Sequence, residues 1–275
     1  MDAYAILSFH KTDMIRLLQF PESLFLSLQP VILSSWPHGI QSSGPYTDTP
    51  NSFQIKLKGR PFGWTMNQDA LGGARLVRDL FAFFYHHNYE IVMPFSTAQR
   101  LTSKDMLIFR PRAPSAPILP PREWLAIAPL RSDRLYIIGD SQPNFDSFRV
   151  SAVDPTPDHI VMLTQSITRM FKDLGLLQKS ESRYNWIEYQ LKGRPWLYGK
   201  EAGVKTRLML LRLFQTLESL GWSCHTSVQH RTGNDDKRML DTMFFSRPKD
   251  TIPNPSPASY TLSPTASELP SYSEI

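Results

Sequence analysis

The pentapeptide LKGRP occurs twice in the chain, at residues 57–61 and again at residues 191–195. Each copy ends a stretch in which apolar and polar side chains alternate, which predicts a β-strand with one apolar face. The apolar positions of the two stretches are Phe53, Ile55, Leu57, Ile187, Tyr189 and Leu191. Glycine tolerates a bend, and proline cannot donate to a strand ladder. Both strands are therefore expected to end at Gly-Arg-Pro, and the repeat indicates two copies of one structural unit.

The two copies also agree along a helical segment downstream. LVRDLFAFFYHHNYEI (residues 76–91) and MLLRLFQTLESLGWSC (residues 209–224) align without a gap. Their shared apolar positions are spaced i, i+1, i+4, i+5 and i+8, which is one face of an amphipathic helix. Asn88 aligns with Gly221, and these residue types are well suited to the left-handed position that ends a helix. Each unit is therefore expected to contain one long helix with a buried side.

The repeat extends upstream as well. Each unit begins with a predicted β-hairpin whose turn ends at Asp13 or Asp133, followed by a second helix. In the first unit this helix contains Pro30 and is expected to be kinked or broken there. Two further strands follow the long helix, so each unit is predicted as ββαβαββ. The fold class is α+β, with a mainly antiparallel sheet and helices on one face.

The domain boundaries follow from this repeat. The first unit is predicted at residues 1–112, a Pro-rich linker at 113–121, and the second unit at 122–249. Residues 250–275 are rich in Pro and Ser and poor in aliphatic side chains, which predicts a disordered tail. Residues 42–51 and 140–158 are expected to be exposed loops. A period this long indicates tandem domains rather than a solenoid, and we expect them to pack with pseudo-two-fold symmetry unless the linker holds them apart.

Composition limits the class of protein. Of the 275 residues, 41% are hydrophobic, enough for a sizeable core, but no run is long and apolar enough to predict a membrane span. The first residues do not predict a signal peptide. Cys224 is the single cysteine, so an intrachain disulfide is impossible and a cytoplasmic or nuclear location is expected. A net charge of +5 is compatible with an anionic partner, but the sequence lacks the dense Lys/Arg stripe of a dedicated nucleic-acid binder.

The paired segments resemble an uncharacterised, mainly fungal family of duplicated-domain proteins with no known activity. The resemblance is carried by SFHKTDMIRLLQFP, FQIKLKGRPF and DMLIFRPR in the first unit, and by YQLKGRPWLYG, LESLGWSC and DTMFFSRP in the second. It covers nearly everything except the linker and the tail. It implies the domain organisation and no particular chemistry.

The most prominent repeated polar feature is a pair of basic side chains beside aromatic ones. We predict binding positions at Lys58, Arg60, Trp64, Lys192, Arg194 and Trp196. Cations next to aromatic rings are how phosphate-bearing single strands are held. The alternative interpretation is that the charges solvate the strand end and discourage edge pairing.

Sequence patterns for catalysis and cofactor binding are missing. Gly72 and Gly73 precede a helix, but the segment matches neither phosphate-binding glycine motif. His225 and His230 have no carboxylate at metal-ligand spacing, and neither GxSxG nor HExxH occurs. We therefore predict no catalytic residue, no metal and no cofactor.

Three functional hypotheses stay open. The first is a non-catalytic binding or scaffolding protein that uses an exposed sheet face, an edge or the groove between domains. The second is an RNA- or DNA-binding protein that uses the basic strand ends. The third is an enzyme whose site is assembled from residues distant in sequence.

Overall fold

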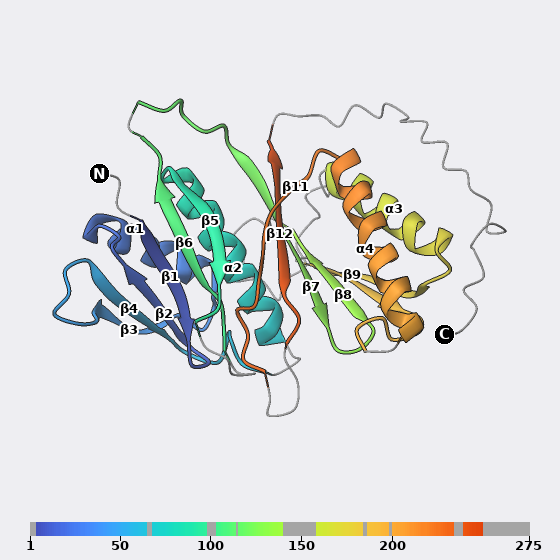
Figure 1. Cartoon of the computed structure of the whole chain (residues 1–275), viewed down its shortest axis with the longest axis horizontal. Helices are drawn as coiled ribbons and strands as arrows, with labels where there is room; N and C mark the ends of the chain where they lie inside the picture. Colours follow the sequence, from blue (N-terminus) through green and yellow to red (C-terminus); the bar gives the residue numbers. More distant parts are fainter. Residues whose placement is uncertain are drawn as a thin grey trace, which may run out of the picture.

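Each half of the chain folds into a six-stranded antiparallel sheet with two helices against one face (Figure 1). This computed structural model describes residues 4–64, 68–97, 103–113, 115–139, 158–183, 186–197, 200–233 and 239–249. The predicted α+β class and the tandem duplication are confirmed. Nearly all of the loop predicted at 140–158 and all of the tail predicted at 250–275 lie outside the described residues.

The first unit has eight elements. They are β1 (Ala5–His10), β2 (Met14–Leu18), α1 (Glu22–Ser35), β3 (Ile40–Pro45), β4 (Ser52–Leu57), α2 (Gln68–His86), β5 (Tyr89–Phe95) and β6 (Met106–Pro111). Their sheet order is β3-β4-β2-β1-β6-β5. Buried and partly exposed side chains alternate along β1, β2 and β4, and the buried ones pack beneath the helices, as the period-two pattern predicts.

The second unit repeats the same eight elements. They are β7 (Arg122–Leu130), β8 (Arg134–Ile138), α3 (Asp158–Asp173), β9 (Leu177–Arg183), β10 (Trp186–Leu191), α4 (Lys200–Ser219), β11 (Ser223–Val228) and β12 (Thr242–Pro248). The order β9-β10-β8-β7-β12-β11 matches the first sheet strand for strand. Both units are therefore ββαββαββ, with one more strand than the sequence pattern predicts.

The additional strand lies at a sheet edge in both units. Residues 42–51 are expected to form a loop, but Ile40–Pro45 pairs antiparallel with β4, and Leu177–Arg183 pairs in the same way with β10. An edge strand hydrogen-bonds on one side only and packs little against the core. The sequences IQSSGP and LQKSESR therefore lack the apolar alternation by which strands are predicted.

Helix α1 is continuous through Pro30, so the expected break does not occur. Proline removes the backbone hydrogen bond to the carbonyl of Leu26. Pro30 and Leu26 both lie on the exposed side of the helix, where the carbonyl can hydrogen-bond to solvent. The cost of proline is lowest at such a position.

The repeated pentapeptide forms the same backbone structure in both units. Gly59 and Gly193 both adopt φ of +78°, a left-handed conformation that favours glycine. The amide of Leu57 donates to the carbonyl of Asp13 at 2.8 Å, and the amide of Leu191 donates to that of Asp133 at the same distance. The segment therefore ties the end of β4 or β10 to the turn of the neighbouring hairpin.

The two units pack head to tail. Helix α2 lies on its own sheet and also against β7 and β8, so it separates the two sheets, whereas α3 and α4 cover the other face of the second sheet (Figure 1). Most residues of β7 are buried because both faces of this sheet are covered. The expected pseudo-two-fold packing is therefore wrong, since it would require α4 to cover β1 and β2 in return. The helical face of one unit instead packs on the sheet face of the next.

None of the helices in the described part of the chain is long and apolar enough to cross a membrane.

Candidate binding face on the first sheet

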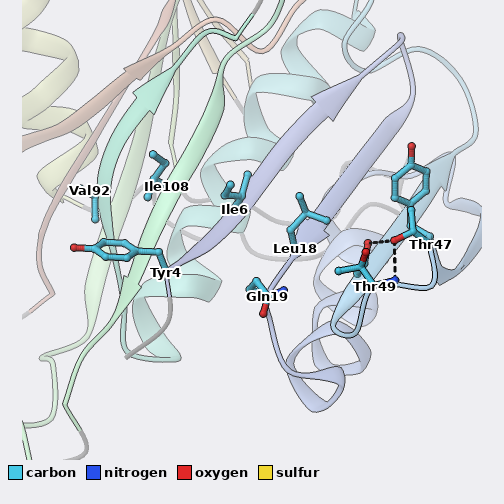
Figure 2. A pocket seen from close by; sticks show the side chains of 10 residues that line it. Tyr4, Ile6, Leu18, Gln19, Thr47, Thr49, Val92 and Ile108 are labelled. Carbon is cyan, nitrogen blue, oxygen red and sulfur yellow. Dashed lines mark hydrogen bonds between the residues drawn. The ribbon is translucent and has the colours of Figure 1, made fainter. Parts of the chain in front are cut away.

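One face of the first sheet is covered by none of the helices in the described part of the chain; we call it the open face. A pocket of about 720 Å³ lies on this face, between β5 and the β3–β4 loop (Figure 2). It is lined by Tyr4, Ile6, Leu18, Gln19, Tyr46, Thr47, Thr49, Ser52, Val92 and Ile108. The strand register places Ile6 between Leu18 and Ile108, so the centre of the pocket is an aliphatic row across three strands. A concave, mainly apolar surface of this kind is typical of a binding site.

The equivalent face of the second sheet is occupied. There the same register places Ala126 between Ile138 and Phe244, and all three are at most 2% exposed because α2 covers them. The Phe81 ring of α2 meets Phe244 edge-on, with centroids 4.7 Å apart. The first sheet therefore leaves bare the surface that the second sheet uses to hold a helix.

A polar row runs beside the aliphatic row on the open face. Arg16 donates from Nε to Oε1 of Gln54 at 2.9 Å, and its guanidinium lies 3.9 Å above the ring of Tyr46. A second guanidinium nitrogen lies 3.4 Å from Nδ1 of His10. Burial lowers the pKa of His10 to about 4, and the charges of Arg16 and Lys104 act in the same direction. His10 is therefore neutral at pH 7, and Arg16 carries the charge of this row.

The first sheet is short of acidic side chains. Its six strands contain a single carboxylate, Glu90. This carboxylate is already shared between Arg110 at 3.1 Å and Arg112 at 3.2 Å. Arg16 and Lys56 form no ion pair with a carboxylate among the described residues. The open face consequently carries excess positive charge.

The positions predicted from the basic pentapeptide lie elsewhere. Lys58 and Arg60 are exposed in the turn after β4, and Lys192 and Arg194 are exposed in the turn after β10. Within the described residues, no hydrogen bond or ion pair joins one pair to the other. The basic residues therefore belong to two separate turns, each in its own unit.

The two predicted tryptophans differ in their surroundings. Trp64 is 57% exposed, close to Lys58 and Arg60 in the chain. Trp196 is half-buried, and its indole donates to the carbonyl of Arg134 at 2.9 Å. Trp196 therefore anchors the turn after β10, whereas Trp64 presents its ring to solvent.

A histidine and a serine that are distant in sequence meet beside the linker. Nε2 of His225 lies 2.6 Å from Oγ of Ser246, and Arg122 donates to the same oxygen at 2.7 Å. Strand pairing of β11 with β12 brings the two residues together, and no local motif indicates it. Ser246 is fully buried, so a substrate cannot reach its hydroxyl. The pair is a structural contact rather than a nucleophile and its base.

A loop of the second unit inserts polar side chains into the junction with the first. His230 is 1% exposed and lies among the rings of Phe9, Phe62 and Phe244, at centroid distances of 6.2 to 6.3 Å. Burial and the neighbouring charge of Arg231 lower its pKa to about 3. The amide of Gln229 donates to the Asp105 carboxylate at 2.8 Å. This loop therefore fastens the units together.

Clusters suited to a metal are missing from the described residues, where no group of three His, Cys, Asp or Glu side chains gathers. Gly72 and Gly73 have a packing role instead of binding phosphate. A Cβ on Gly73 would lie 2.1 Å from the carbonyl oxygen of Pro61, and one on Gly72 would lie 2.7 Å from the ring of Trp36. The two glycines let α2 approach the pentapeptide turn and α1.

The model of one uncharacterised domain family matches the chain twice, over residues 3–110 and residues 123–246. The two matches correspond to the two sheet-and-helix units and together span most of the chain. No curated protein and no solved structure matches it.

Proposed function

We propose that this chain, which belongs to that uncharacterised domain family and carries the domain twice, is a non-catalytic binding protein that acts through the open face of its first sheet. The observation that carries the proposal is the contrast between the two sheets. The face that α2 covers in the second unit has an uncovered counterpart in the first, and that counterpart forms an apolar pocket. The proposal includes a cytoplasmic or nuclear location, which the single cysteine favours.

The pocket chemistry supports binding rather than catalysis. Its lining contains no Asp, Glu, His, Cys, Lys or Arg side chain. The hydroxyl groups of its Tyr, Ser and Thr residues therefore have no His, carboxylate or cationic neighbour in the lining that could activate them for nucleophilic or acid–base catalysis. Aliphatic, hydroxyl and amide groups supply shape and hydrogen bonds instead, which is what a recognition surface requires.

Affinity capture with matched variants tests this proposal. We expect Ile108→Asp, in the centre of the open face, to lose proteins that the unchanged chain retains from a cell extract. Leu211→Asp is the control, because Leu211 lies on α4, far from the open face, and is 61% exposed. Circular dichroism and thermal unfolding verify that both variants fold. Equal capture by the unchanged chain and Ile108→Asp would overturn the assignment of the binding surface.

Nucleic-acid binding is the second candidate, and the exposure of Trp64 beside Lys58 and Arg60 favours it. An exposed ring next to cations provides stacking and phosphate contacts. A gel shift with mixed RNA and DNA oligonucleotides at low and high salt tests it. Binding that weakens with salt and is lost in Lys58→Ala/Arg60→Ala supports this candidate, and no binding at low salt eliminates it.

A further inference from the structure

We infer that the open face docks an amphipathic helix of a partner protein, and that this helix carries acidic side chains beside its apolar stripe. The inference rests on the proposed function and specifies the class of partner. It is drawn from a helix–sheet interface already present within the molecule. Helix binding by a preformed apolar groove is a recurring recognition mode.

The internal interface shows what this surface accepts. Helix α2 places aromatic side chains on the second sheet: Phe81 on Phe244, and Tyr85 on Trp124 with ring centroids 5.7 Å apart. Arg78 donates to the carbonyl of Gly139 at the end of β8. The helix thus contacts the sheet with side chains at i, i+3 and i+7, which lie on one side of a helix.

The first sheet presents an equivalent surface with different side chains. Its aliphatic row of Ile108, Ile6 and Leu18 occupies the register positions of Phe244, Ala126 and Ile138. Tyr4 lies two residues before Ile6, as Trp124 lies two residues before Ala126. The equivalence of both the register and the apolar character points to a helix as the occupant.

The charges of the open face specify the partner further. Where the second sheet has Tyr136 paired with Ala128, the first has Arg16 paired with Ser8. Lys56 lies on the same face, next to Met14 in the register. With Glu90 bound to two arginines, a docked helix would meet two cations that lack an ion-pair partner among the described residues. Acidic side chains on the helix would pair with them in a partly desolvated interface, which favours an acidic partner.

A second copy of this chain is a poorer occupant. Helix α4 exposes an apolar stripe of Val204, Leu208 and Leu211. That stripe is flanked by Lys205, Arg207 and Arg212, all of them exposed. These cations would face Arg16 and Lys56 across the interface, and like charges there oppose association.

Nucleic acid is also a poorer occupant of this face. Single strands are held by aromatic rings whose faces are free for stacking. The centre of the open face is aliphatic, and the ring of Tyr46 is already covered by the guanidinium of Arg16. An apolar helix stripe complements such a surface better than a base does.

Designed helical peptides test the inference with the full chain. Three fluorescently labelled peptides of about 20 residues share one stripe of Leu and Phe and carry Glu, Lys or Gln on its flanks. We expect the Glu peptide to bind about tenfold more tightly than the Lys peptide in an anisotropy titration. We also expect that preference to shrink as salt is added. In Arg16→Glu/Lys56→Glu the preference should reverse, a result that general unfolding would not produce.

Two further measurements separate the possible outcomes. Loss of all peptide binding in Leu18→Gln and in Ile108→Asp places the site on the open face. Equal binding of the three peptides, or binding of none, overturns the inference. If Ile108→Asp nevertheless abolishes capture of proteins from extract, the proposed function stands and only the assignment of an acidic helix fails. Analytical ultracentrifugation tests whether the chain binds a second copy of itself. If the chain self-associates and Ile108→Asp and Leu208→Glu each abolish this, a second copy is the occupant and the inference is overturned.

Discussion

Gly59 and Gly193 show how a short motif acts through backbone geometry. Both residues have φ of +78°, and both precede an exposed arginine. The surroundings differ, because a Cβ on Gly59 would lie 3.2 Å from the ring of Trp36, whereas nothing lies within 4 Å of one on Gly193. The pentapeptide recurs because both turns require this conformation and the same amide-to-carbonyl bonds, a requirement that does not depend on ligand binding.

We expect Gly193→Ala to lower the free energy of unfolding by about 1–2 kcal/mol, the cost of a left-handed conformation for a residue with a side chain. Gly59→Ala should cost more, because the added methyl group also presses on Trp36. Urea unfolding of the two variants measures the difference. Equal losses would mean that the Trp36 contact relaxes without cost.

The buried His230 predicts sensitivity to acid. His230 has a folded pKa of about 3, compared with 6.5 for an unperturbed histidine, because burial disfavours its charged form. Because the folded pKa is lowered, the contribution of neutral His230 to the free energy of unfolding is fully present above pH 6.5. That contribution is lost as the pH falls, at up to about 1.4 kcal/mol per pH unit. The lowered values of about 4 for His10 and His225 act in the same direction.

His230→Phe should therefore flatten the dependence of stability on pH between 7 and 4, since phenylalanine takes up no proton in its aromatic surroundings. Urea unfolding at several pH values, with the unchanged chain alongside, measures the two slopes. Parallel curves would show that another group controls the acid response.

At the scale of elements, the strongly periodic segments were predictable and the weakly periodic ones were not. The first hairpin, α4 and the strands ending in the pentapeptide each bury one face, so their apolar spacing appears in the sequence. The edge strands β3 and β9 are held chiefly by backbone hydrogen bonds, which leave no apolar pattern. Pro30 was misleading because its effect depends on which side of α1 faces water.

The glycines near the start of α2 and α4 provide an element-scale prediction. Gly73→Ala should destabilise the chain by about 1–3 kcal/mol or more, since its Cβ would overlap the carbonyl oxygen of Pro61. Gly203→Ala should instead stabilise it by up to about 1 kcal/mol, because only the end of the Arg207 side chain is near and alanine favours helix. Thermal unfolding of both variants measures this. Stabilisation by Gly73→Ala would contradict the close approach of α2 to the pentapeptide turn.

At the scale of the whole molecule, the duplication was predictable and the packing of the two units was not. Aligned segments reveal that a unit occurs twice. The placement of one unit relative to the other depends on which apolar face of the first packs against which apolar face of the second. One indication was present: β7 reads WLAIAPL, nearly continuous in apolar residues, as a strand covered on both faces requires. The candidate site could not be predicted because the open face is made of scattered residues from five segments, whereas the basic pentapeptide is a local motif that is visible in the sequence.

The head-to-tail interface predicts unequal behaviour of the separated units. Residues 113–275 alone should expose the Trp124 and Phe244 face that α2 covers, bind the dye ANS strongly and self-associate. Adding residues 1–112 in trans should suppress both effects, because α2 returns to that face. Dye fluorescence and size-exclusion chromatography measure this, and a second unit that neither binds dye nor responds to the first would contradict the shared core.

Because a helix layer of one unit lies on the sheet of the next, this stacking has a polarity and does not close on itself. Another unit of the same fold could therefore be added at either end of the stack. A third unit fused ahead of the first, with its long helix laid over Ile6 and Ile108, would convert the recognition surface into interior. Such a three-unit chain should unfold at a higher temperature and should no longer bind a helical peptide. The added interface would increase stability and remove the binding surface.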